Sequence, residues 1–211
     1  MICPIHQVNS KTGNNFADWD IVQRVLKGDT PAFGMIINNT EGLVAQIVFR
    51  MIPRVEDRKD MAQEIYLKAF SHLAGFRFQS KLSTWIARIA YNTCLSWLEK
   101  KKLVLPGHPS DKDLQDEDLL TALSDGSPDG PENTTEQFIF QKELSVILQV
   151  EIDCLPPVYK TLITLYHQEE LSYEEIAQIT SLPGGTVKSY LFRARRTLKK
   201  NLLAKYKKES L

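Results

Sequence analysis

The chain contains few of the residues that stabilise secreted or metal-bound proteins. It has 3 cysteines among 211 residues, and no Cys-x-x-Cys spacing joins Cys3, Cys94 and Cys154. This pattern argues against a disulfide framework and against a cysteine-ligated zinc site. The 4 histidines are equally scattered, without metal-ligand spacing. We therefore expect no bound metal, and we expect Cys94 and Cys154 to be small, buried apolar residues.

Long apolar runs and nucleotide-binding motifs are also missing. No apolar run approaches the roughly 20 residues that a membrane helix needs. The first residues lack the basic segment followed by an apolar segment that marks a signal peptide. No glycine-rich phosphate loop and no catalytic cluster is present, so we expect neither a cofactor nor an enzyme. These absences predict a protein of the reducing cytoplasm that does not insert into membranes.

Charge is balanced overall but unevenly distributed. The formal net charge is +0, with 26 basic and 26 acidic residues. Lysine and arginine crowd residues 188–208, whereas aspartate and glutamate crowd residues 111–129. Such asymmetry indicates a basic working surface and an acidic linker.

Helical periodicity divides the chain into two parts. Apolar residues recur at helical spacing from Trp19 to Lys102 and again from Gln137 to about Leu203, and no β-type alternation of useful length occurs. Thr30 is suited to cap one of the first helices, with Pro31 at its first position. The stretch between the two parts is rich in proline, glycine and acids. We predict an all-α fold of two small helical domains on a flexible acidic linker, with a tail at 1–18, domains at 19–102 and 136–211, and the linker at 103–135.

The second part contains a helix-turn-helix pattern. Ser172 and Glu175 have the spacing of a capping box, which fixes the start of the first helix. A turn follows at residues 180–183, and the next helix has a buried stripe formed by Val187, Leu191, Ala194 and Leu198. A solvated basic helix is the plainer interpretation, but box, turn and basic face together favour DNA binding. The residues expected to contact duplex DNA are Gly185, Thr186, Lys188, Ser189, Tyr190, Arg193 and Arg196.

Two motifs in the first part carry a resemblance to a known family. The segments 57–70 and 76–92 resemble conserved region 2 of bacterial sigma-70-type factors, and residues 155–198 resemble region 4. Nothing between them resembles region 3. This minimal layout is similar to that of the extracytoplasmic-function (ECF) sigma factors.

The resemblance implies a dissociable specificity subunit of bacterial RNA polymerase. It implies that region 2 docks on the β′ clamp helices of the core enzyme, and that region 4 docks on the β flap and binds the −35 promoter element as duplex. It also implies regulation by an anti-sigma factor. The matching positions for core binding are Asp60, Gln63, Glu64, Leu67 and Lys68.

The resemblance further implies that region 2 captures a melted −10 element. The loop at residues 76–83 matches the segment that receives a flipped base. Phe76 and Phe78 can stack on bases, while Arg77 and Lys81 can meet phosphates. Arg88 and Asn92 follow on the next helix, where an amide offers both a donor and an acceptor to a base edge.

Two other classes of function stay open from the sequence. A stand-alone helix-turn-helix regulator would bind duplex operators without core polymerase. A helical nucleic-acid enzyme is disfavoured by the lack of clustered carboxylates or histidines.

Overall fold

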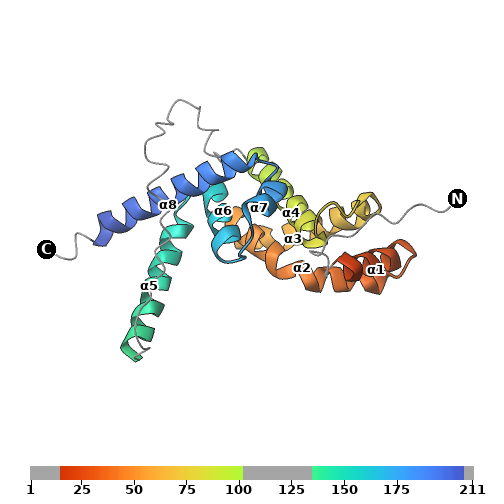
Figure 1. Ribbon diagram of the computed structural model, residues 1–211, viewed down its shortest axis with the longest axis horizontal. Helices are drawn as coiled ribbons and strands as arrows, with labels where there is room; N and C mark the ends of the chain where they lie inside the picture. The colour runs from red at the N-terminus through yellow and green to blue at the C-terminus, as the bar shows by residue number, and fades with distance from the viewer. Residues whose placement is uncertain (1–14, 102–134, 207–211) are drawn as a thin grey trace.

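The computed structural model describes residues 15–101 and 135–206, and every regular element in these residues is helical (Figure 1). The all-α prediction is therefore confirmed. The first 14 residues of the predicted tail and residues 103–134 of the predicted linker lie outside the described residues. No helix in the described ranges combines the length and apolar character that crossing a membrane requires.

The first half consists of α1 (Asn15–Leu26), α2 (Thr30–Met51), α3 (Val55–His72), a 3-10 turn (Leu73–Gly75) and α4 (Leu82–Lys100). The cap of α2 is Asp29, whose carboxylate accepts a hydrogen bond from the Ala32 amide at 3.2 Å. The predicted cap, Thr30, is wrong by one position, because Thr30 is already the first helical residue. The helix ends before Pro53, which cannot continue it.

The second half consists of α5 (Thr135–Asp153), α6 (Pro157–His167), α7 (Tyr173–Thr180) and α8 (Gly184–Tyr206). The predicted capping box of α7 is confirmed. The Glu175 amide donates to Ser172 Oγ at 3.2 Å, and the Ser172 amide donates to Glu175 Oε2 at 3.0 Å. Ser181 then adopts a left-handed conformation, with φ 59°, which reverses the chain between α7 and α8.

Burial follows the predicted stripe of α8. Val187, Leu191, Ala194 and Leu198 are all buried. Cys94 is also buried, as predicted, and burial raises the pKa of its thiol to about 12. The same prediction is wrong for Cys154, which is exposed because it lies in the turn between α5 and α6.

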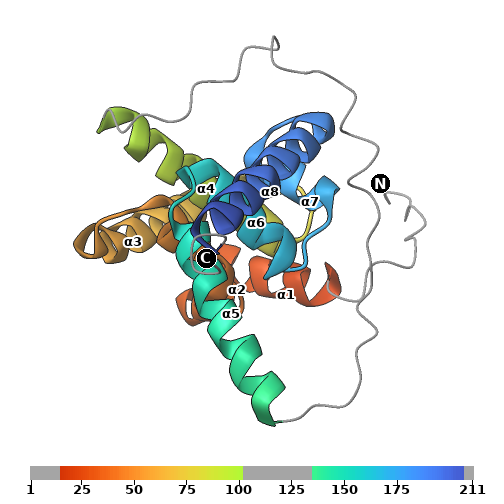
Figure 2. The ribbon, with the colours of Figure 1, turned by 90° about the vertical axis from the view of Figure 1, so that its left-hand side faces the viewer.

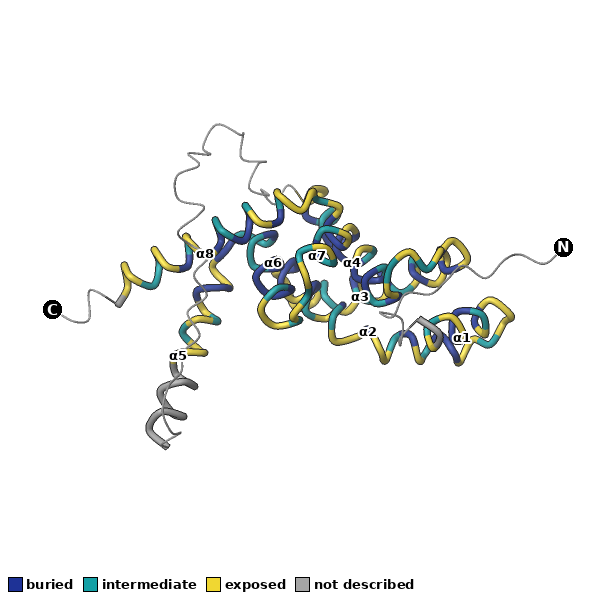
Figure 3. The backbone as a smooth tube through the Cα atoms, viewed as in Figure 1, coloured by how far each residue is buried: buried dark blue, intermediate teal, exposed yellow. Residues whose placement is uncertain are grey.

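The two halves pack against each other. α4 contacts α7, and α2 contacts α6, so helices from both ends of the chain share one body (Figures 1 and 2). By contrast, α5 projects away from this body (Figures 1 and 3). Its exposed apolar side chains are Leu144, Val146, Leu148 and Val150. Neither the direct packing of the halves nor the projection of α5 follows from the periodicity of the sequence.

Candidate nucleic-acid interface

The loop before α4 is built around an aromatic cluster. Phe76 donates its amide to the Leu73 carbonyl at 3.0 Å, which closes the turn after α3. Its ring lies 4.6 Å from the ring of Phe78 and 5.2 Å from that of Trp85, centroid to centroid. Phe78 has φ 56°, a strained value for a residue with a side chain. Phe76 is buried, whereas Phe78 and Trp85 are half-buried, so the cluster has one covered and one accessible side.

A hollow of about 340 Å³ opens beside this cluster. Three of the predicted −10 residues, Phe76, Arg77 and Arg88, line it together. The hollow is also lined by Gly75, Gln79, Ser80, Thr84, Trp85 and, from α7, Gln178. Its volume falls within the range of sites that hold small ligands. Phe78 packs against Phe76 but does not line the hollow, and Asn92 is exposed one helical turn beyond Arg88.

The remaining predicted loop residue, Lys81, faces the other half of the chain. Its Nζ lies 2.8 Å from Oε1 of Glu175 on α7. Burial on its own raises the pKa of Glu175, but the hydrogen bonds from Lys81 and Ser172 outweigh it. The pKa of this carboxyl is therefore held below its ordinary value, and the ion pair persists at neutral pH.

The predicted DNA-binding face of α8 is only partly open. Lys188 is exposed and lies 5.5 Å above the ring of Tyr173, and Arg196 is exposed further along. Ser189 donates its hydroxyl to the Gly185 carbonyl at 2.9 Å within the helix. Tyr190 is buried, with its ring 5.6 Å from that of Tyr159. The assignment of these side chains to DNA stays a prediction.

The remaining members of this predicted set lie on the same helix. Gly185 is exposed in the first turn of α8, and Thr186 and Arg193 are half-buried. The backbone amides of a helix start can receive a phosphate.

The outer face of α3 carries all five residues predicted to contact core polymerase. Asp60, Gln63 and Glu64 are exposed, and Leu67 is 70% exposed. Lys68 is half-buried and lies 2.6 Å from Glu64. A single exposed leucine is ordinary on a protein surface, so the assignment of this face to core polymerase stays a prediction.

Comparison with known proteins decides between the open interpretations. Residues 36–104 match the family described as sigma-70 region 2, and residues 145–198 match the family described as sigma-70, region 4. The chain is 35% identical over 181 residues to the ECF RNA polymerase sigma factor SigW of Bacillus subtilis, covering 86% of this chain and 94% of SigW. The chain belongs to the ECF sigma factors of the sigma-70 family. It is also 37% identical over 181 residues to the ECF RNA polymerase sigma-E factor of Escherichia coli K12, covering 86% and 92% of the two chains.

As an ECF sigma factor, the chain directs transcription initiation and is not an enzyme. The resemblance drawn from residues 57–92 and 155–198 is confirmed, and the interpretation as a stand-alone regulator is not supported.

Solved structures support the fold of this ECF sigma factor. CnrH, in a complex with the cytosolic domain of CnrY, superposes with a TM-score of 0.58 at 18% identity, covering 89% of this chain and 98% of CnrH. The sigma factor RpoE, in a complex with the anti-sigma factor NepR from Bartonella quintana, gives a TM-score of 0.54 at 19% identity, covering 81% and 96%. At these low sequence identities, the structural similarity establishes the fold alone.

Two residues of the ECF sigma factor surfaces were missed from the sequence. Gln178 lines the loop hollow from α7, and no local pattern connects it to a loop some hundred residues earlier. Phe70 is 48% exposed on α3, beyond Leu67, with its ring 5.1 Å from that of Phe33. An aromatic three positions after an exposed leucine was a visible signal for a larger apolar patch.

Proposed function

We propose that this ECF sigma factor reads a bipartite promoter with the surfaces described above. The loop hollow holds a base of the melted −10 strand, α8 holds the −35 duplex, and the outer face of α3 docks on the β′ clamp helices of core polymerase. The observation that carries this proposal is the hollow itself, because it gathers Phe76, Arg77 and Arg88 around one space suited to a ligand.

Single-stranded DNA suits the chemistry of the hollow. Stacking of a base on an aromatic ring contributes about 1–3 kcal/mol, and cationic side chains follow the backbone phosphates. This offsets the few kcal/mol that extruding a base from duplex costs. Arg77 and Arg88 supply the cations at the rim, and the exposed Asn92 amide supplies a donor and an acceptor for a base edge.

Duplex DNA suits the exposed face of α8. Lys188 and Arg196 project from this face, and Gly185 lies in the first turn, where unpaired amides and the helix dipole favour a phosphate. Gly184 at the helix start leaves the backbone accessible, since a Cβ there would meet nothing within 4 Å. We assign the two DNA surfaces to domains at 19–102 and 136–211, and the segment 103–135 to the linker between them.

Run-off transcription with purified core polymerase tests this assignment. Templates are selected by sequencing the promoters bound after overproduction. Arg88→Ala should weaken open-complex formation while leaving binding to core unchanged, because Arg88 lines the hollow and does not belong to the α3 face assigned to core polymerase. Lys27→Ala, which removes the same charge from an exposed position in the turn after α1, is the matched control. If Arg88→Ala formed open complexes as well as wild type does, the proposed role of the hollow in holding the melted strand would be refuted.

We further propose that the protein acts in the cytoplasm and has an anti-sigma partner. Support comes from the two structural neighbours, which were both solved as complexes, one of them with a protein named as an anti-sigma factor. Co-purification from the native host under non-inducing conditions should recover a stoichiometric partner, and recovery of core polymerase alone would contradict this part of the proposal.

A further inference from the structure

A second cavity lies between the two halves of the chain. It measures about 760 Å³ and is lined by α2 and α3 from the first half, and by α5 and the residue that follows α6 from the second. We call it the Phe49 groove, after the aromatic residue that lines it. Its volume falls within the range of sites that hold small ligands. None of the residues predicted to contact DNA or core polymerase lines it, so it is distinct from the surfaces assigned above.

The apolar part of the Phe49 groove contains an accessible aromatic ring. Phe49 is 45% exposed and lines the groove together with Ala45, Val48 and Ala62. Arg58 lies over the Phe49 ring, with its Cζ 4.3 Å from the ring centroid. Aromatic rings and guanidinium planes both stack on further flat groups. The groove therefore suits a ligand that has a flat ring.

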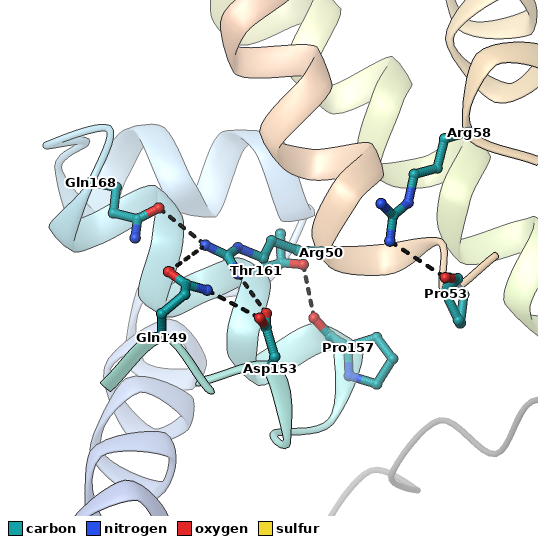
Figure 4. Close-up of polar contacts among 8 residues, drawn as sticks. All are labelled: Arg50, Pro53, Arg58, Gln149, Asp153, Pro157, Thr161 and Gln168. Atoms are coloured by element: carbon teal, nitrogen blue, oxygen red, sulfur yellow. Dashed lines mark hydrogen bonds and ion pairs between the residues drawn. The ribbon is translucent and has the colours of Figure 1, made fainter. Parts of the chain in front are cut away.

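A buried arginine fixes one wall of the groove. Arg50, near the end of α2, has only 4% of its side chain exposed. Its guanidinium donates to Asp153 at 2.6 Å, to Gln149 at 3.2 Å and to Gln168 at 3.3 Å (Figure 4). All three partners belong to the second half of the chain and line the groove. The charge of Asp153 is therefore balanced by Arg50, and this wall is ordered before any ligand binds.

Two further cations line the groove without an acidic partner. Among the described residues, no carboxylate forms an ion pair with Arg58 or Lys59. Arg58 donates through Nε to the Ile52 carbonyl at 2.9 Å, and through Nη2 to the Pro53 carbonyl at 3.4 Å (Figure 4). These carbonyls orient the guanidinium without neutralising its charge. The groove therefore keeps an excess of two positive charges, and one of the two cations is held in place.

We propose that the Phe49 groove is a binding site for a small aromatic anion, whose ring stacks beside Phe49 and whose acidic head lies at Arg58 and Lys59. The inference goes beyond promoter recognition and does not depend on it. A neutral ring would leave the two cations without a partner, and an aliphatic acid would leave the Phe49 ring unstacked. Single-stranded nucleic acid is held by a positively charged groove that follows its backbone, whereas two neighbouring cations match a single acidic head.

A pair of fluorescent probes that differ only in the acidic head tests this proposal on the full-length chain. Anilinonaphthalene sulfonate is the anion, and phenylnaphthylamine has the same rings without the sulfonate. The fluorescence of both compounds rises in apolar sites, so titration gives both affinities. The sulfonate should bind about tenfold more tightly than the neutral compound, because it adds hydrogen bonds to charged groups. Equal affinities of wild type for the two compounds would overturn the proposal.

Removal of the two cations tests where the acidic head lies. Arg58→Gln with Lys59→Gln should lower the affinity for the sulfonate to that for the neutral compound, whose own affinity should stay unchanged. Unchanged binding of the neutral compound also shows that the groove remains folded. The matched control is Lys27→Gln with Lys100→Gln, which removes two cations from exposed positions outside the groove and should bind both probes as wild type does. Wild-type affinity of the Arg58 and Lys59 double variant for the sulfonate would overturn the proposal.

Removal of the aromatic ring tests where the body of the ligand lies. Phe49→Ala should weaken the binding of both probes about tenfold, because each loses its stacking partner. Leu148→Ala is the control, since Leu148 is an exposed apolar residue of α5 that does not line the Phe49 groove. It should bind both probes as wild type does. Weaker binding in Leu148→Ala with wild-type binding in Phe49→Ala would place the probes on α5 and overturn the proposal.

Discussion

The buried position of Arg50 predicts an unequal response to removing either member of its ion pair. The Arg50 side chain is 4% exposed, whereas that of Asp153 is 45% exposed. Asp153→Ala therefore leaves a buried cation with two amide partners, while Arg50→Met leaves a carboxylate that water reaches.

The magnitudes follow from these exposures. Removing one partner from a buried ion pair costs about 3–5 kcal/mol. Gln149 and Gln168 continue to accept from Arg50, so we expect Asp153→Ala to cost about 2 kcal/mol, the range for loss of a charged hydrogen bond. Asp153 ends α5, and removing an acid from a helix C-terminus returns only a few tenths of a kcal/mol. Arg50→Met keeps the volume without a charge and should cost less than about 1 kcal/mol.

Urea unfolding followed by circular dichroism and tryptophan fluorescence measures both values. Asp20→Ala, an exposed acid on α1, is the control and should stay within about 0.5 kcal/mol of wild type. A larger loss in Arg50→Met than in Asp153→Ala would refute the reasoning. A free energy of unfolding of Asp153→Ala equal to that of the control would refute it as well.

Three further outcomes are expected from local features of the fold. Burial raises the pKa of the Cys94 thiol from 9.0 to about 12, so its contribution to stability is complete below about pH 9 and is lost as the pH rises toward 12. By linkage, the free energy of unfolding of wild type should fall by about 1.4 kcal/mol relative to that of Cys94→Ala between about pH 7.5 and about pH 10. Urea unfolding with reductant present measures this difference, and parallel pH profiles of the two proteins would contradict it. Leu162→Ala should lower the free energy of unfolding by about 2–5 kcal/mol, because Leu162 is fully buried and its removal leaves a cavity. Leu148→Ala, at an exposed position, should have little effect, and equal melting temperatures of the two variants would contradict this expectation. Ser172→Ala should cost about 1 kcal/mol through the lost cap of α7, while Ser172→Asp should retain most of the stability.

Local features were predictable from the sequence, because neighbouring residues determine them. The capping box of α7 and the buried stripe of α8 depend on spacings of three and four residues, and both are observed. The loop of the hollow was identified through its family resemblance, and three of its members do share one space.

Contacts between the halves were not predictable in this way. Arg50 and Asp153 are 103 residues apart, and Lys81 and Glu175 are 94 apart. The periodicity of apolar residues predicts local helices, and it gives no information on which residues at such separations form a contact. The same limit explains Tyr190, which helical spacing placed on the polar face although the structure buries it near Tyr91 and Tyr159. The predicted burial of Cys154 was wrong for a different reason, because this residue lies in the turn after α5 and its side chain is exposed there.

The two oxygens of Glu175 have separate roles. Oε2 closes the capping box with Ser172, and Oε1 receives Lys81 from the other half. A mutation here is therefore pleiotropic, because it alters the fold of the DNA-binding unit and the link between the halves together. Glutamine is the exception, since it keeps the capping acceptor and discards the charge. In a genetic selection, Glu175→Gln should emerge as a separation-of-function allele, whereas other replacements at this position should behave as simple loss-of-function alleles.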